Sequence, residues 1–121
     1  MNNSKTKIIA VANQKGDVAK TTSVINIGAG LALKGKKVLL VDTDNQSHLS
    51  RFLGYDGTDG KPTISELIWQ TVSKVQKPLS EAIRKSELGV DYIPCNFFAC
   101  RNYLYSRNRQ RQHRCFQPSF L

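Results

Sequence analysis

The sequence has no apolar run that approaches the roughly 20 residues needed to span a bilayer. The apolar stretch nearest the N-terminus, residues 8–12, is too short for the apolar core of a signal peptide. Three cysteines in 121 residues are too few for a disulfide scaffold. These absences predict a cytoplasmic protein with neither a transmembrane helix nor a disulfide framework.

A metal centre is not indicated either. One set of soft ligands could be assembled from the sequence, and it consists of Cys95, Cys100, His113 and Cys115. Its spacing lacks the paired C-x₂-C arrangement that makes zinc sites recognisable. We therefore interpret the cysteines as unpaired thiols.

Acidic residues are absent after Asp91, and the composition changes near residue 96. Residues 1–96 hold 13 Lys and Arg and all 9 acids, whereas residues 97–121 hold five arginines, no lysine and no acid. This tail also lacks Gly, Val, Ile and Thr, yet it contains six of the nine Phe and Tyr. The two parts therefore differ in amino-acid composition, and no linker separates them.

Three interpretations of this Arg/aromatic tail stay open: out-of-frame translation, nucleic-acid binding, and a solvated basic tail without a specific role. Translation in a shifted reading frame would produce such a change, and it predicts that residues 97–121 are out of frame or disordered and violate the local preferences of a folded chain. Alternatively, interleaved arginine and aromatic side chains neutralise phosphates and stack on bases in segments that bind nucleic acid without sequence preference.

The N-terminal part has the pattern of a βαβ unit. Residues 8–12 and 38–41 are continuous apolar runs, which are typical of parallel strands buried on both faces. Between them, residues 21–34 have helical character, and Gly35 stands where a helix C-terminal glycine belongs. We expect the two strands to be paired or close neighbours, joined by a right-handed crossover.

The pattern continues to residue 94. Residues 55–62 form a loop rich in Gly and Asp, and Thr63 and Glu66 have the spacing of a capping box. The box opens a helix with an apolar face made of Ile64, Leu67, Ile68, Val72 and Val75. A short helix over residues 80–85 and a strand over residues 90–93, stopped by Pro94, complete an α/β fold with a mainly parallel sheet and helices on both faces.

The candidate functional residues lie in the loop between the first strand and the first helix. Backbone N–H groups and the positive end of the helix dipole would point there at an anion. Lys20 adds a phosphate-binding charge, and the following Thr21 adds a hydroxyl for Mg²⁺. The strict pattern G-x-x-x-x-G-K-[ST] is not met, because Gln14 and Ala19 stand at the two glycine positions.

With these residues the sequence resembles the ParA/Soj/MinD-type partition ATPases, whose deviant Walker A loop has the form K-G-G-x-G-K-[ST]. The matching loop residues are Lys15, Gly16, Val18, Lys20, Thr21 and Thr22. The likeness extends through residues 35–44 and Gln46, and it covers roughly residues 5–96. It implies the N-terminal portion of a P-loop ATPase domain, followed by the tail over residues 97–121, hence an incomplete domain.

The resemblance implies ATP and Mg²⁺ as cofactors. The nucleotide would be held by the loop residues Lys15, Gly16, Asp17, Val18, Ala19, Lys20, Thr21 and Thr22. Among them, Lys20 would hold the β- and γ-phosphates, Thr21 would ligate Mg²⁺ and Thr22 would contact the α-phosphate. Asp42 resembles the carboxylate that orders the Mg²⁺ shell.

Catalysis and assembly are implied in the same way. Asp44 resembles the carboxylate that positions the attacking water, and Lys15 the lysine that reaches across a dimer to the partner's nucleotide. An intact relative would be a homodimer that binds DNA non-specifically, has a centromere-binding partner of the ParB type, serves plasmid or chromosome partition, and does not involve the membrane.

Three departures from the family pattern predict impaired activity. Asp17 replaces a glycine and places a carboxylate near phosphate, where two unit charges about 4 Å apart repel by about 4 kcal/mol. Ala19 replaces the glycine before Lys20, so a Cβ obstructs close approach and any positive φ. The Walker B acid is missing, since no acid follows Asp91. The alternative function is therefore a non-enzymatic remnant or a basic nucleic-acid-binding fragment.

Overall fold

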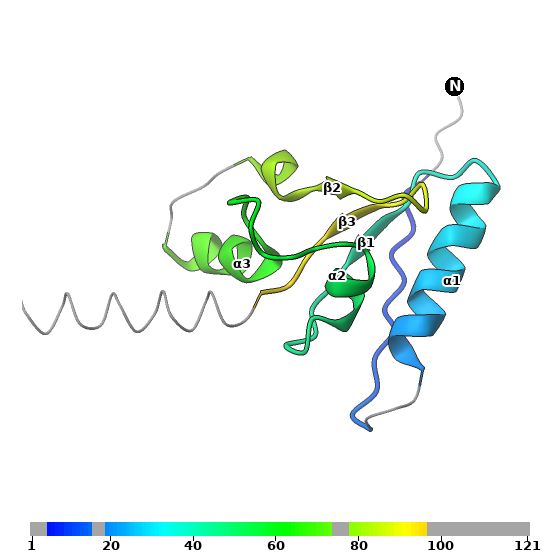
Figure 1. Cartoon of the computed structure of the whole chain (residues 1–121), viewed down its shortest axis with the longest axis horizontal. Coiled ribbons are helices and arrows are strands. Elements are labelled where there is room, and N and C mark those ends of the chain that lie inside the picture. The colour runs from blue at the N-terminus through cyan, green and yellow to red at the C-terminus, as the bar shows by residue number, and fades with distance from the viewer. Residues whose placement is uncertain (1–4, 16–18, 74–77, 97–121) are drawn as a thin grey trace, which may run out of the picture.

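The computed structural model describes residues 5–15, 19–73 and 78–96 (Figure 1). The predicted tail, residues 97–121, and the loop residues Gly16, Asp17 and Val18 lie outside this part of the chain. The described residues form helices α1, α2 and α3, the 3₁₀ helix η1, and strands β1, β2 and β3. Figure 1 shows α1 and α3 on opposite sides of β3.

The three strands form one small mixed sheet in the order β1-β3-β2. The edge strand β1 (Leu39–Val41) runs parallel to the central strand β3 (Asp91–Ile93), with Leu40 opposite Tyr92. On the other side of β3, the two-residue strand β2 (Arg84–Lys85) pairs antiparallel. The predicted α/β class and the strands near residues 38–41 and 90–93 are therefore confirmed.

Helix α1 (Lys20–Leu33) confirms the predicted helix to within one residue at each end. It ends in a Schellman motif, in which the Gly35 N–H bonds the Ala32 carbonyl at 2.9 Å and the Lys36 N–H bonds the Leu31 carbonyl at 3.1 Å. Gly35 has a φ of 75°, a conformation that costs a side-chain-bearing residue energy, so a glycine is favoured there.

The core lies where α1 and α2 (His48–Phe52) pack on one face of the sheet. It is formed by Ile25, Leu40, Leu49, Leu53, Val90 and Tyr92. A Cβ added to Gly28 would come within 3.0 Å of the Leu40 Cδ2, so the glycine lets α1 approach β1 closely. This contact fixes how α1 lies along the strand that leads to Asp42.

Helix α3 (Ile64–Ser73) begins at the predicted capping box, of which one half is formed. The Thr63 N–H donates to the Glu66 carboxylate at 2.7 Å, while the buried Thr63 hydroxyl has no hydrogen-bond partner within the described residues. Of the predicted apolar face, Ile64 and Leu67 are half-buried and Ile68 is 59% exposed. Val75 lies outside the described residues, and nothing is described of the Val72 side chain.

The prediction of a strand over residues 8–12 is wrong. These residues have no strand structure and no ladder partner among the described residues, and β1 pairs with β3 instead. Ile8 is 95% exposed and Ile9 is 67% exposed. The β-branched residues Ile8, Ile9 and Val11 suit a strand, but a strand also needs a neighbour whose N–H and C=O groups complete the ladder.

Two further expectations are corrected. The strand at residues 38–41 is not buried on both faces, because Leu39 and Val41 are 44% and 43% exposed while Leu40 is buried. Successive side chains of a strand point to opposite faces, so Leu39 and Val41 lie on the face opposite the core that Leu40 joins, whereas both Tyr92 and Ile93 of the central strand are buried. Residues 80–85 are not one helix. They divide into η1 (Leu79–Ala82) and β2, since Arg84 pairs with Tyr92 in the sheet.

Candidate functional site

The candidate site lies at the carboxyl edge of the parallel strand pair. Asp42 and Asp44 follow β1, and Cys95 follows β3, so parallel pairing brings these chain ends to one edge. In Figure 1 the amino end of α1 and the turn after β1 lie at the same end of the molecule. This is the edge at which open α/β sheets bind ligands.

Lys20, the lysine of the predicted phosphate loop, is hydrogen-bonded to Asn13, which precedes the loop. The Lys20 Nζ donates to the Asn13 carbonyl oxygen at 2.7 Å, and the Lys15 N–H donates to the Asn13 Oδ1 at 2.9 Å. Lys20 and Thr21 are half-buried, whereas Lys15 and Thr22 are exposed. Asn13 therefore organises the described residues on both sides of the loop.

Ala19 is the N-cap of α1 and adopts the left-handed conformation, with φ 55° and ψ 26°. A residue with a Cβ is disfavoured there by about 1–2 kcal/mol. Its side chain offers no acceptor for the first N–H groups of the helix, and no acid lies in the first turn. The helix N-terminus thus keeps the character of an anion site, but the cap is strained.

Asp42 is buried, with 4% of its surface exposed, and its carboxylate accepts three hydrogen bonds from the protein. Its Oδ2 accepts from the Ser50 N–H at 2.9 Å and from the Ser50 hydroxyl at 2.5 Å, and its Oδ1 accepts from the Asp44 N–H at 3.1 Å. A carboxylate is stable in the interior when such donors surround it.

Asp44 is half-buried, and its Oδ1 accepts from the Gln46 N–H at 3.0 Å. The Ser47 N–H bonds the Asp44 carbonyl at 3.0 Å, so residues 44–47 close into a turn. Ser47 has a φ of 54°. Ala19 and Ser47 are the two described non-glycine residues with positive φ, and Ala19 stands where the family pattern has glycine.

The predicted site residues form two groups at this edge. Lys20, Thr21 and Thr22 occupy the first turn of α1, and Asp42 and Asp44 lie in the turn after β1. Within the described ranges no hydrogen bond or ion pair joins the two groups, and the ion pairs formed there are Arg84–Asp59 and Lys85–Asp91. Helix α2 and its Ser50 were not predicted, because a five-residue helix has no periodicity to detect.

The described residues contain neither a membrane-spanning helix nor a metal-binding cluster. None of the helices in this part of the chain is long and apolar enough to cross a membrane. No cluster of three or more His, Cys, Asp or Glu side chains arranged to hold a metal ion occurs among residues 5–15, 19–73 and 78–96. Of the cysteine and histidine set named above, Cys95 alone is described, and it is buried.

The family profile described as "AAA domain" matches residues 6–113 of this chain. The chromosome partitioning protein ParA of Caulobacter vibrioides is 40% identical over 91 residues, which cover 74% of this chain and 32% of the relative. The chain belongs to the ParA/Soj-type partition ATPase family. Within the family, the chromosome-partitioning ATPase Soj of Treponema pallidum is 49% identical over 72 residues, covering 54% of this chain and 28% of the relative.

A solved structure is similar to this chain in both fold and sequence. The cobyrinic acid a,c-diamide synthase of Mycobacterium smegmatis, solved with an ATP analogue and magnesium, superposes with a TM-score of 0.61 at 40% identity. The match covers 70% of this chain and 33% of that protein. The chain thus has part of a P-loop ATPase domain and spans about a third of the length of the ParA relative.

Proposed function

We propose that this chain is the nucleotide-binding portion of a partition ATPase whose phosphate loop binds ATP–Mg²⁺ weakly. The observation that carries the proposal is the left-handed Ala19, which directly precedes Lys20 at the N-terminus of α1. Family membership supports the ligand class, and the strained cap supports the low affinity.

The lysine, hydroxyl and carboxylate side chains of the site are of the types that bind a triphosphate and its metal. Lys20 would hold the β- and γ-phosphates, Thr21 and Asp42 would hold Mg²⁺ and its shell, and Thr22 would contact the α-phosphate. The bound nucleotide supplies a phosphoanhydride bond, and Asp44 would orient the water that attacks it. One of the three Lys20 ammonium N–H groups already donates to the Asn13 carbonyl at 2.7 Å, so two N–H groups would be left for the phosphates.

Two residues oppose the ligand. The Cβ of Ala19 would crowd the cradle that glycine would leave open, and its left-handed backbone, with φ 55°, is disfavoured for a residue with a Cβ. Asp17 adds a negative charge to the loop, and a repulsion of about 4 kcal/mol corresponds to about a thousandfold in affinity. We therefore expect ATP hydrolysis at background level.

The wider role is proposed on the same basis. The partners would be a second copy of the chain, non-specific DNA and a centromere-binding protein of the ParB type, in the cytoplasm. These assignments are supported by the ParA and Soj relatives, of which the chain spans 32% and 28%.

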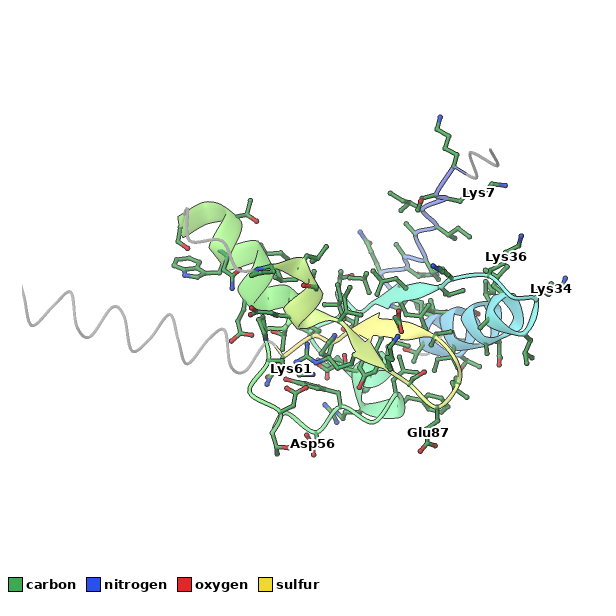
Figure 2. All side chains as sticks on the ribbon, turned by 90° about the horizontal axis from the view of Figure 1, so that it is seen from above. Lys7, Lys34, Lys36, Asp56, Lys61 and Glu87 are labelled. Atoms are coloured by element: carbon green, nitrogen blue, oxygen red, sulfur yellow. The ribbon has the colours of Figure 1, made fainter. Side chains whose placement is uncertain are left out.

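Calorimetric titration with ATP–Mg²⁺ tests the proposal. We expect weak or undetectable binding to the unmodified chain, and at least about tenfold tighter binding after Asp17→Gly with Ala19→Gly. Adding Lys20→Ala to this pair should abolish the gain. Lys34→Ala is the matched control, because Lys34 is exposed at the opposite end of α1 (Figure 2). Micromolar affinity in the unmodified chain would contradict the weak-binding proposal, and no binding by the double variant would contradict the nucleotide site.

The second candidate is a non-enzymatic fragment that binds nucleic acid through its basic tail. It is favoured by the five arginines of residues 97–121, which have no acid among them. Such binding would fall steeply with salt, show no sequence preference and disappear when the tail is removed. Salt-dependent DNA affinity that survives removal of residues 97–121 would exclude this candidate.

A further inference from the structure

Ser50 connects three segments of the chain at the candidate site. It is fully buried in α2, and its hydroxyl donates to the Asp42 carboxylate at 2.5 Å. The same oxygen accepts the Cys95 N–H at 2.9 Å. One side chain therefore ties the end of β1, the helix that follows it, and the residues after β3.

The hydroxyl orients the carboxylate of Asp42. A donor–acceptor distance of 2.5 Å lies at the short end of the range for an O–H···O⁻ hydrogen bond, and the Ser50 N–H binds the same oxygen at 2.9 Å. With Oδ2 held by two donors, Oδ1 points at the Asp44 N–H, 3.1 Å away. Since Asp42 is 4% exposed, water does not readily replace a missing donor.

The turn that carries Asp44 depends on this arrangement. The Asp44 N–H is held by Asp42, while the Asp44 carbonyl accepts from the strained Ser47 and its Oδ1 from Gln46. We propose that Ser50 is a positioning residue, which locks the Asp42 carboxylate and through it fixes the turn that presents Asp44. The proposal rests on the proposed function, because it gives Asp44 the task of orienting water.

This role differs from general support of the fold. Loss of a structural contact would lower protection against hydrogen exchange throughout the described core. Loss of a positioning contact would change the amides of Asp44 and Cys95 selectively, because these N–H groups are bound by Asp42 and by the Ser50 hydroxyl itself. The amide of Leu31, in the last turn of α1, serves as the internal reference.

The first experiment uses ¹⁵N-labelled full-length chain without nucleotide. In Ser50→Ala, exchange at Asp44 and Cys95 should rise about tenfold relative to Leu31, the factor that corresponds to one lost hydrogen bond. Ser50→Cys keeps the volume with a weaker donor, and it provides the measurement if the alanine variant does not fold. Ser80→Ala, at an exposed serine in η1, should leave both ratios unchanged. Unchanged Asp44 and Cys95 ratios in the Ser50 variants would overturn the proposal.

The second experiment adds ATP–Mg²⁺ to the Asp17→Gly, Ala19→Gly chain, with and without Ser50→Ala. We expect the Lys20 amide to shift in both, and the Asp44 amide to shift only where Ser50 is present. Equal Asp44 shifts in both would overturn the positioning role. A chain in which the Lys20 amide never shifts would contradict the proposed function, while the nucleotide-free exchange data still decide the role of Ser50.

Discussion

Arg84 donates two parallel hydrogen bonds to the Asp59 carboxylate, from Nε to Oδ2 and from Nη2 to Oδ1, each 2.9 Å long. The guanidinium is 7% exposed, and it also donates to the carbonyl oxygens of Lys61, Pro62 and Ala82. The Tyr55 ring lies 5.4 Å from its central carbon. All five N–H groups of Arg84 are thereby used, and the loop at residues 55–62 is fastened to β2.

Asp59→Asn should destabilise the fold at neutral pH by about 1–2 kcal/mol, because it weakens the charge partner of a buried guanidinium that stays ionised. Asp56→Asn, in the same loop, should change stability less, since Asp56 is exposed and bonds Thr58 within the loop (Figure 2). Denaturant unfolding at pH 7 measures both. Equal midpoints for Asp59→Asn and the unmodified chain would contradict this prediction.

The same pair predicts a dependence on acid. The Arg84 hydrogen bonds hold the pKa of Asp59 below its ordinary value of 3.8. A carboxyl whose pKa is lowered by folding adds stability that is fully present above the unfolded pKa and is lost as the pH falls through the folded pKa. Unfolding midpoints measured from about pH 5 down to about pH 2 should therefore fall less in Asp59→Asn than in the unmodified chain. Parallel curves would rule out this linkage.

Ala19→Gly should stabilise the chain by about 1 kcal/mol, because Ala19 has a φ of 55° and glycine adopts that conformation without strain. Ala29→Gly is the matched control inside α1 and should cost about 0.5–1 kcal/mol, since glycine weakens a helix interior. Each substitution removes one methyl group. A rise in the unfolding temperature for Ala19→Gly and a fall for Ala29→Gly would therefore identify backbone strain as the cause. A loss of stability in both would refute the strain at the cap.

Glu66→Ala should lower stability by about 1 kcal/mol. The Glu66 carboxylate accepts the Thr63 N–H at 2.7 Å at the start of α3, and alanine leaves that N–H without its partner. Glu81→Ala, at an exposed acid in η1, is the control with an equal change of charge. Chemical denaturation of the two variants gives the comparison, and similar losses in both would show that charge rather than capping matters.

Cys95 should react slowly with thiol reagents. Its side chain is buried, and burial raises the pKa of the thiol, so the reactive thiolate is scarce at neutral pH. In a chain with Cys100→Ser and Cys115→Ser, labelling of Cys95 by a disulfide reagent should become fast only in denaturant. Labelling at the rate of a free peptide thiol under native conditions would contradict this.

Features that depend on residues close together in the chain could be predicted. The end of α1 at Gly35 and the box between Thr63 and Glu66 are set by spacings of a few residues, and both were predicted. The resemblance of residues 15–22 to a Walker A loop also depends on short spacings, and the positive φ at Ala19 agrees with the glycine that the family pattern places there, while their role in binding phosphate stays a prediction.

The sequence by itself thus determined the family, the first helix and its C-terminal glycine, because helix and turn signals act between neighbours. Only the tertiary structure decided that β1 pairs with β3 rather than with residues 8–12, and that Asp42 is buried under Ser50. It also decided that Arg84 meets Asp59, 25 residues away, and that Ser50 meets Cys95, 45 residues away. A buried polar group is stable only when it is hydrogen-bonded, and the partners available to it are the groups that packing places beside it. Because that packing involves the whole domain, residues near in sequence do not determine such pairs.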